Sequence, residues 1–207
     1  YGDWMLGLLH GNLGVSAVGG RSVAGQVVPR MSVTFPLIVL SLLIALAIGL
    51  PLGCAAVLAR SHRLRGLYHG IAIVAGAIPA LWGGLLLILL FSRGSGLLGL
   101  LPAQGFPDDG WSSPLRALAS LTLPALTTGI TAGASIMRYT RAAVRDMASS
   151  QAVDMAMACG MTRTQAVLRV ALRLATPHLV SVIGLTFAQM ITGVMVVENL
   201  CALPGLG

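Results

Sequence analysis

Four long apolar stretches decide what this chain can fold into. They cover residues 33–58, 70–92, 117–137 and 174–197, and none of them contains Asp, Glu, Lys or Arg. A helix needs about 20 mostly apolar residues to cross the hydrocarbon layer of a membrane, so each stretch is long enough for one span. The sequence therefore predicts an all-α, polytopic transmembrane helical bundle.

Composition excludes several other classes. Hydrophobic residues make up 56% of the chain and charged residues 9%, whereas soluble domains carry about 25% charge. The chain contains no lysine, which excludes a P-loop and a Schiff-base enzyme. Its three cysteines are far apart, and no catalytic or metal-binding constellation is visible. The arginines do not cluster with aromatic residues, so no nucleic-acid partner is predicted.

Arginine is distributed unequally between the two sides of the predicted bundle. Nine arginines follow the first and third stretches, and the other four lie on the opposite side. The positive-inside rule therefore predicts that the nine-arginine side is cytoplasmic. Residues 1–32 then form an extracytoplasmic or interfacial segment.

The segment of residues 138–173 is longer than a simple connector needs to be. Arg138, Arg141 and Arg145 recur at helical spacing. They are expected to extend the third span into the cytoplasm as a basic face near the lipid headgroups.

A short helix is predicted over residues 151–159. Ser149 or Ser150 can cap its start, and Gly160 can end it in a left-handed conformation. Thr162 and Gln165 fit a capping box at the start of a further helix.

The short helix is expected to present apolar side chains, namely Val153, Ala156, Met157 and Met161. Two interpretations remain open on these residues alone. The helix either docks another protein or lies on the bilayer surface.

The run Asp154-Met155-Ala156-Met157-Ala158-Cys159-Gly160 resembles the E-A-A-x-x-x-G loop of bacterial ABC-importer permeases. In those proteins this loop couples the permease to its ATPase. Asp154 stands where the glutamate is, Ala156 where the second alanine is, and Gly160 where the glycine is. Met155 replaces the first alanine.

Further segments resemble the dipeptide, oligopeptide and nickel branch of these permeases, in the same order along the chain. They cover residues 11–16, 78–82, 100–105, 123–126, 138–141 and 197–207. The resemblance implies an ABC transmembrane type-1 permease fold over residues 33–207. Such permeases have six spans, so it also implies that the first and last spans are absent from this sequence.

The resemblance further implies a non-catalytic subunit of the bacterial inner membrane, surrounded by lipid. Its partners would be a second homologous permease subunit, two cytoplasmic ABC ATPases and an extracytoplasmic substrate-binding protein. ATP and magnesium would be bound by the ATPase subunits, and no cofactor by this chain. The residues expected to couple to the ATPase are Val153, Asp154, Ala156, Met157, Gly160 and Met161.

Two polar residues are candidates for the translocation path or its gate. Gln189 lies inside the last apolar stretch, and Glu198 follows it directly, where its charge is expected to be hydrated. Di- or oligopeptides are the expected cargo, with nickel, glutathione or haem as alternatives. An ion-coupled secondary transporter is the rival class, although it would usually place an ionisable group inside a span.

Overall fold

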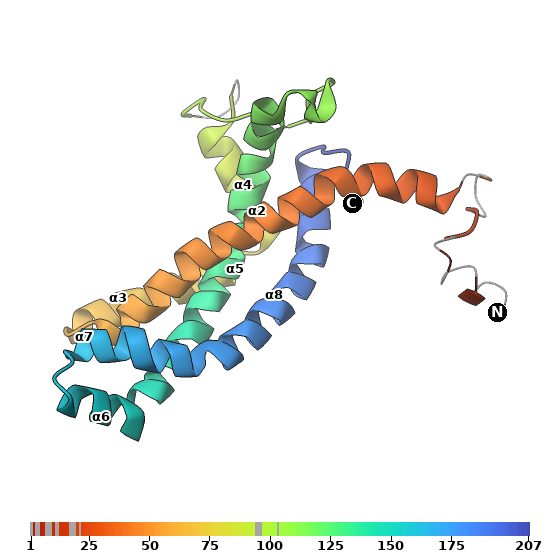
Figure 1. Ribbon diagram of the computed structural model, residues 1–207. Coiled ribbons are helices and arrows are strands. Elements are labelled where there is room, and N and C mark those ends of the chain that lie inside the picture. Colours follow the sequence, from red (N-terminus) through yellow and green to blue (C-terminus); the bar gives the residue numbers. More distant parts are fainter. Residues whose placement is uncertain are drawn as a thin grey trace.

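The computed structural model describes residues 2, 5–6, 10, 13–16, 20, 22–93, 97–102 and 104–207. These residues form helices joined by turns, with two isolated β-bridges, Val15 to Ser22 and Ser92 to Leu101 (Figure 1). The all-α prediction is confirmed. Positions 11, 12 and 103 of the family-like segments lie outside the described residues, as does most of residues 1–21.

The first predicted span is longer than its apolar stretch. Helix α2 (Val23–Leu58) begins ten residues before position 33, after Ser22, whose hydroxyl accepts a hydrogen bond from the Gly25 amide at 3.3 Å. It continues through Pro29, Pro36 and Pro51.

The second predicted span is broken in the middle. Helix α3 (His62–Ala77) and helix α4 (Ala80–Phe91) meet at Ile78 and Pro79 with a bend of 100°. The predicted span over residues 70–92 therefore consists of two helices, and it is a single span only as a bent pair. Proline disfavours helical geometry in the residue before it, and Ile78 is extended at φ −75° and ψ 118°.

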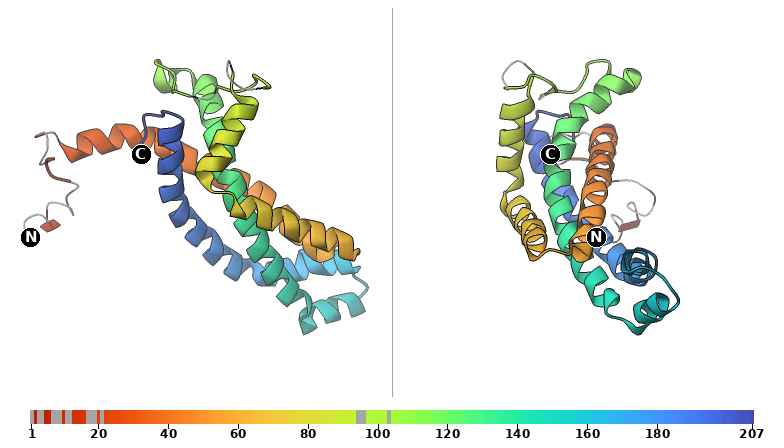
Figure 2. Two further views of the ribbon diagram at one scale, coloured as in Figure 1. Left: turned by 180° about the vertical axis from the view of Figure 1, so that it is seen from behind. Right: turned by 90° about the vertical axis from the view of Figure 1, so that its left-hand side faces the viewer.

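Helix α5 (Pro114–Ala148) is the central element of the bundle. It contacts α2, α3, α4 and helix α8 (Leu172–Leu200), and Figure 2 shows it between α4 and α2. Of its most apolar window, 61% is buried inside the chain, against 22% for the last long helix. Ser120, Thr127, Thr128 and Thr140 of this helix are buried inside the chain, as polar side chains of a membrane helix usually are. Thr122, Thr131 and Ser135 are half-buried.

Paired glycines bring α2 and α5 close together. A β-carbon on Gly49 would lie 2.8 Å from the Gly133 carbonyl oxygen, and one on Gly53 would lie 2.6 Å from Cβ of Thr140. Beside them, the Ser41 and Thr128 hydroxyls form an interhelical hydrogen bond of 2.6 Å. Small residues at four-residue spacing permit this close contact.

The loop at the arginine-poor end packs against α2. It contains a 3₁₀ turn (Gly110–Ser112), and the indole nitrogen of Trp111 donates to the Ser32 carbonyl at 3.0 Å. The rings of Phe106 and Trp111 meet edge to face at 5.7 Å.

At the arginine-rich end, the chain turns through helix α6 (Gln151–Ala158) and helix α7 (Arg163–Ala166). A π-helical turn (Val167–Ala171) then joins α7 to α8. Three helices of the described chain are long and apolar enough to cross a membrane, or four if α3 and α4 count as one bent span.

Candidate functional site

Helix α6 has the local structure that its sequence predicts. It begins after Ser150 and ends at Ala158, and Gly160 adopts φ +92°, which favours glycine over residues with a side chain. The Met161 amide donates to the Ala156 carbonyl at 3.1 Å and closes the turn. The predicted serine cap is absent from α6. The Ser150 hydroxyl has no hydrogen-bond partner in the described chain, and the Ser149 hydroxyl donates to the Asp146 carbonyl.

The capping box at the next helix is confirmed. The backbone amide of Gln165 donates to Thr162 Oγ1 at 3.4 Å, and the backbone amide of Thr162 donates to Gln165 Oε1 at 3.1 Å. These paired bonds fix the direction in which the chain returns toward the bundle.

One face of α6 packs against the rest of the protein. Val153 is only 1% exposed and belongs to a buried cluster with Val144, Ala166 and Val167. The expectation that Val153 is presented on the surface is therefore wrong. Ala156 and Met161 pack partly against the same cluster.

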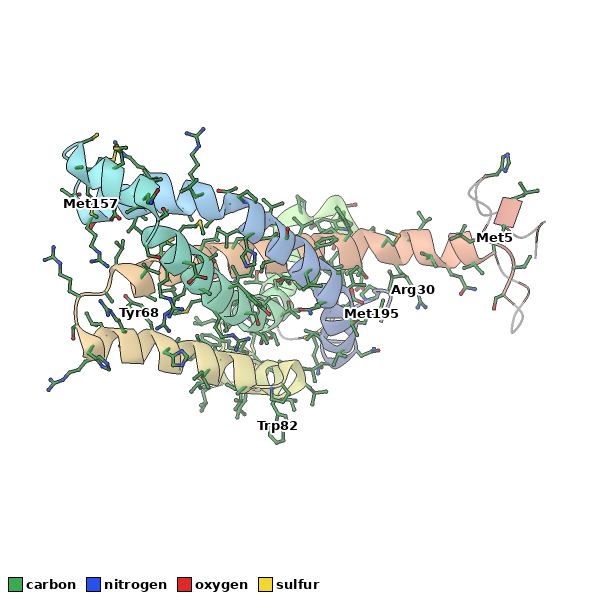
Figure 3. The ribbon with its side chains drawn as sticks, turned by 90° about the horizontal axis from the view of Figure 1, so that it is seen from below. Met5, Arg30, Tyr68, Trp82, Met157 and Met195 are labelled. Atoms are coloured by element: carbon green, nitrogen blue, oxygen red, sulfur yellow. The ribbon has the colours of Figure 1, made fainter. Side chains whose placement is uncertain are left out.

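The opposite face of α6 is open. On this face Met155 is 69% exposed, and Cys159, four residues later, is exposed as well. Asp154 is also exposed, and Met157, one turn after Val153, is 38% exposed at the edge of the packed face (Figure 3). The sequence analysis missed Met155 and Cys159 as surface residues. Met155 comes two residues after Val153, so it lies on the opposite side of the helix, and Cys159 follows four residues later on the same side as Met155. This spacing is the signal that could have identified both as surface residues.

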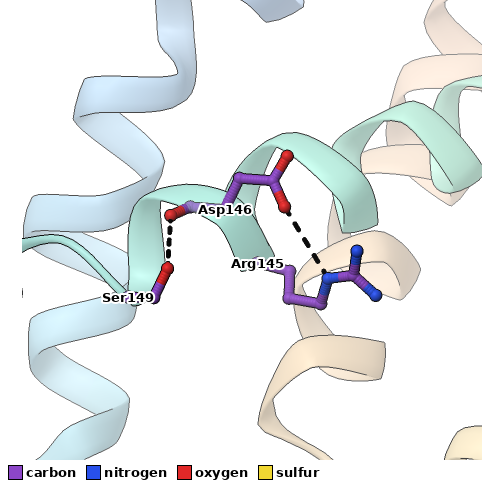
Figure 4. Close-up of polar contacts among 3 residues, drawn as sticks. All are labelled: Arg145, Asp146 and Ser149. Atoms are coloured by element: carbon purple, nitrogen blue, oxygen red, sulfur yellow. Dashed lines mark hydrogen bonds and ion pairs between the residues drawn. The ribbon is translucent and has the colours of Figure 1, made fainter.

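Arg138, Arg141 and Arg145 all lie on α5, as predicted, and they continue it beyond the apolar stretch. Arg145 forms an exposed ion pair with Asp146, with 3.7 Å between Nε and Oδ1 (Figure 4). Arg141 lies within hydrogen-bond distance of His69 on α3, with 3.2 Å between Nη1 and Nδ1.

Gln189 lies beside a groove between α5 and α8. The groove has a volume of about 160 Å³, and hydroxyl, amide and small side chains line it: Thr128, Thr131, Ala132, Ser135, Thr186, Gln189, Met190 and Gly193. The Gln189 side chain is exposed and forms no hydrogen bond within the described part of the chain. An amide at this depth needs a polar partner, which another subunit, water or cargo can supply.

Glu198 is completely buried, so the expectation of a hydrated carboxylate is wrong. It lies in the last turn of α8, where its Oε1 accepts a hydrogen bond from the Thr34 hydroxyl at 2.6 Å. Its Oε2 accepts one from the Gly207 amide at 2.9 Å. These two donors replace water around the carboxylate.

No group of three His, Cys, Asp or Glu side chains in the described residues lies close enough together to hold a metal ion. The site therefore consists of a protruding helix face, a basic end and a polar groove, without a described cluster of reactive side chains.

The described chain is an all-helical bundle with three or four candidate membrane spans and a short helix that follows α5. The profile of the binding-protein-dependent transport system inner membrane components matches residues 45–207, and the chain belongs to that family. It is therefore a non-catalytic, multi-pass inner-membrane permease subunit of an ABC transporter. This result decides against the ion-coupled secondary transporter.

Three relatives define the branch. The chain is 30% identical to the dipeptide transport system permease protein DppB of Escherichia coli K12, covering 100% of this chain and 67% of that protein. It is 30% identical to the peptide transport system permease protein SapB of Salmonella typhimurium, covering 99% and 70%. It is 34% identical to the glutathione transport system permease protein GsiC of Escherichia coli O6:H1, covering 96% and 61%.

Proposed function

We propose that this permease subunit forms part of the path by which an ATP-driven importer takes up di- or oligopeptides, and that α6 receives the force from a separate ATPase. The observation that carries the proposal is the two-sided character of α6. Val153 anchors one face in the bundle, while Met155 on the opposite face is exposed. Met157, one turn after Val153, adds a second exposed apolar side chain at the edge of the packed face.

The arginine-rich end is cytoplasmic in this proposal. Nine of the thirteen arginines lie there, as the positive-inside rule requires for the side that stays in the cytoplasm. Helix α6 then faces the compartment in which ATPase subunits bind ATP and magnesium. A second homologous permease subunit and an external binding protein complete the transporter.

The buried cluster under α6 suits the transmission of movement. It joins Val153 to Val144 of α5 and to Ala175 and Leu179 of α8, so a displacement of α6 moves two spans together. A shift of a conformational equilibrium from 1:99 to 99:1 requires about 5.5 kcal/mol of differential binding. A rigidly packed helix can transmit such a difference, whereas a loosely tethered one cannot.

The polar groove beside Gln189 is proposed as one wall of the path. Its exposed amide can donate to and accept from a peptide backbone, and Thr131 and Ser135 supply hydroxyl groups along the same groove. Relatives named for dipeptides and peptides favour peptide cargo, and a relative named for glutathione keeps that tripeptide-like solute as the second candidate. Binding assays with the cognate external receptor distinguish peptides from glutathione, nickel and haem.

The experiment that tests the coupling role compares Gly160→Val with Gly160→Asn in the intact transporter. Valine strains the left-handed turn, whereas asparagine tolerates it. Uptake should fall at least about tenfold with valine and remain near the wild-type rate with asparagine, at equal amounts of inserted protein. Equal uptake by the valine variant would contradict the proposal.

A further inference from the structure

The seam between α3 and α5 contains a basic cleft at the arginine-rich end. The cleft has a volume of about 390 Å³, with Tyr68, His69 and Ala72 on the α3 side and Met137, Arg138 and Arg141 on the α5 side. An adjoining cleft of about 320 Å³ includes Arg65, Arg145 and Arg163. Arg141 and Arg145 line both clefts, and the two neighbouring clefts are together called the basic depression.

The positive charge of this depression is poorly compensated. Of its five arginines, only Arg145 has a carboxylate partner in the described chain, and that pair with Asp146 is exposed. Arg138 donates to a hydroxyl, Arg65 to a backbone carbonyl and Arg141 to His69. The guanidinium groups therefore retain donors for an anion.

A separate apolar groove lies farther along the same two helices. It has a volume of about 430 Å³ and is lined by Ile71, Val74 and Ile78 of the α3 side, Leu86 and Leu87 of α4, and Ile130 of α5. At about 1.5 Å per helical residue, Thr131 of the groove and Arg138 of the cleft are about 10 Å apart along α5.

Arg138 of the basic cleft reaches Gly76, the residue that follows Ala75 of the apolar groove. A β-carbon at Gly76 would be only 2.6 Å from Nη1 of Arg138, so the bare backbone at Gly76 lets the guanidinium group lie across α3. The seam thus places a cation of the basic cleft beside the α3 turn that contributes Ala75 to the apolar groove.

We infer that this seam binds one anionic phospholipid. Its phosphate lies between Arg138 and Arg141, and one acyl chain lies in the groove beside Ile71, Val74 and Ile130. Guanidinium groups bind phosphate oxygens through paired hydrogen bonds, and basic pockets between membrane helices suit anionic headgroups. Neither free phosphate nor an acidic protein surface would need the adjoining apolar groove.

The test uses the full-length permease in its transporter complex, reconstituted in nanodiscs with equal parts of phosphatidylglycerol and phosphatidylcholine of the same chain length. After extraction into mild detergent, native mass spectrometry counts the phosphatidylglycerol retained on the permease. The variant is Arg138→Gln with Arg141→Gln. The matched control is Arg169→Gln with Arg173→Gln, which removes two exposed arginines that line neither cleft.

The cleft variant should bind phosphatidylglycerol about twenty-five-fold more weakly, because each of the two arginines near the headgroup contributes about fivefold. The control should retain it like the wild type. Ala75→Phe, which fills the apolar groove, should also weaken retention while leaving every arginine in place.

Three outcomes would overturn the inference. The first is equal retention of phosphatidylglycerol and phosphatidylcholine by the wild-type protein. Displacement of the lipid by inorganic phosphate alone, with no effect of Ala75→Phe, would assign the cleft to a free anion. Unchanged lipid retention with loss of the ATPase subunits from the cleft variant would assign it to an acidic protein surface.

Discussion

The Thr34 hydroxyl donates a 2.6 Å hydrogen bond to the buried carboxylate of Glu198, 164 residues away in the sequence. The same hydroxyl oxygen accepts a hydrogen bond from the Leu206 amide at 3.0 Å. Thr34 therefore holds the end of α8 and the following segment against α2. This pair closes the end of the bundle opposite to α6.

Thr34→Val should destabilise the protein, because it leaves one carboxylate oxygen and one amide hydrogen without their partners. The expected cost is about 2 kcal/mol, or a decrease in Tm of about 4–8 °C in a chain of this size. Thr176→Val is the matched control, since that exposed hydroxyl only bonds the Leu172 carbonyl of its own helix. Thermal unfolding in detergent measures both, and an equal Tm for the two variants would refute the role of Thr34.

Gly205→Ala should disturb the same contact, because the added methyl group would overlap the Glu198 carboxylate. The loss in Tm should be smaller when Glu198 is already alanine, since the space is then free. A double-mutant cycle with Glu198→Ala measures this coupling. Additive effects of the two substitutions would show that Gly205 does not act through Glu198.

Gly53→Ala should separate α2 from α5. Its β-carbon would lie 2.6 Å from Cβ of Thr140 and 3.0 Å from the Met137 carbonyl oxygen, and overpacking of this kind costs about 1–3 kcal/mol. Gly184→Ala on α8 meets no atom within 4 Å, and it should keep or raise Tm because alanine favours helix. Similar Tm values for both variants would contradict the close α2–α5 packing.

The two faces of α6 should respond differently to a charge. Val153→Asp places a carboxylate in the buried cluster and should lower Tm strongly, since an unpaired buried charge is costly. Met155→Asp should leave Tm within about 2 °C but reduce co-purification of the ATPase subunits. Retention of the ATPase by the Met155 variant would argue against docking on this face.

Local signals in the sequence were sufficient for the turn around α6. Gly160 and the Thr162–Gln165 pair act within a few residues, so their patterns predict the observed stop and capping box. The π-helical turn at Val167–Ala171 has no such signal. Pro79 was a visible signal for the break between α3 and α4, but hydropathy alone treats residues 70–92 as one span.

Long-range contacts explain the remaining errors. Hydropathy treats Glu198 as a surface charge, and only the fold brings Thr34 and the Gly207 amide to it. The sequence pattern of α6 predicts apolar side chains on its surface. It does not show that Val153 packs against other helices of the same chain, as it does in the structure. The anion-binding depression likewise depends on α3 and α5 meeting side by side.

The three cysteines provide an internal scale of accessibility. Cys159 is exposed, whereas Cys54 and Cys201 are buried, and burial raises the pKa of the Cys201 thiol to about 11. The thiolate is the reactive form, so a maleimide at neutral pH should label Cys159 much faster than Cys201. Mass spectrometry of the labelled peptides measures the order, and fast labelling of Cys201 would contradict its burial.

Cys159 lies on the open side of α6 and therefore reports directly on docking. The maleimide labelling rate of Cys159 is measured in the membrane-inserted permease with and without its ATPase subunits. If α6 is the docking helix, the ATPase should slow the labelling at least about tenfold, while the labelling of Cys54 and Cys201 stays unchanged. An unchanged rate at Cys159 in an assembled, transporting complex would contradict the proposal that α6 receives the ATPase.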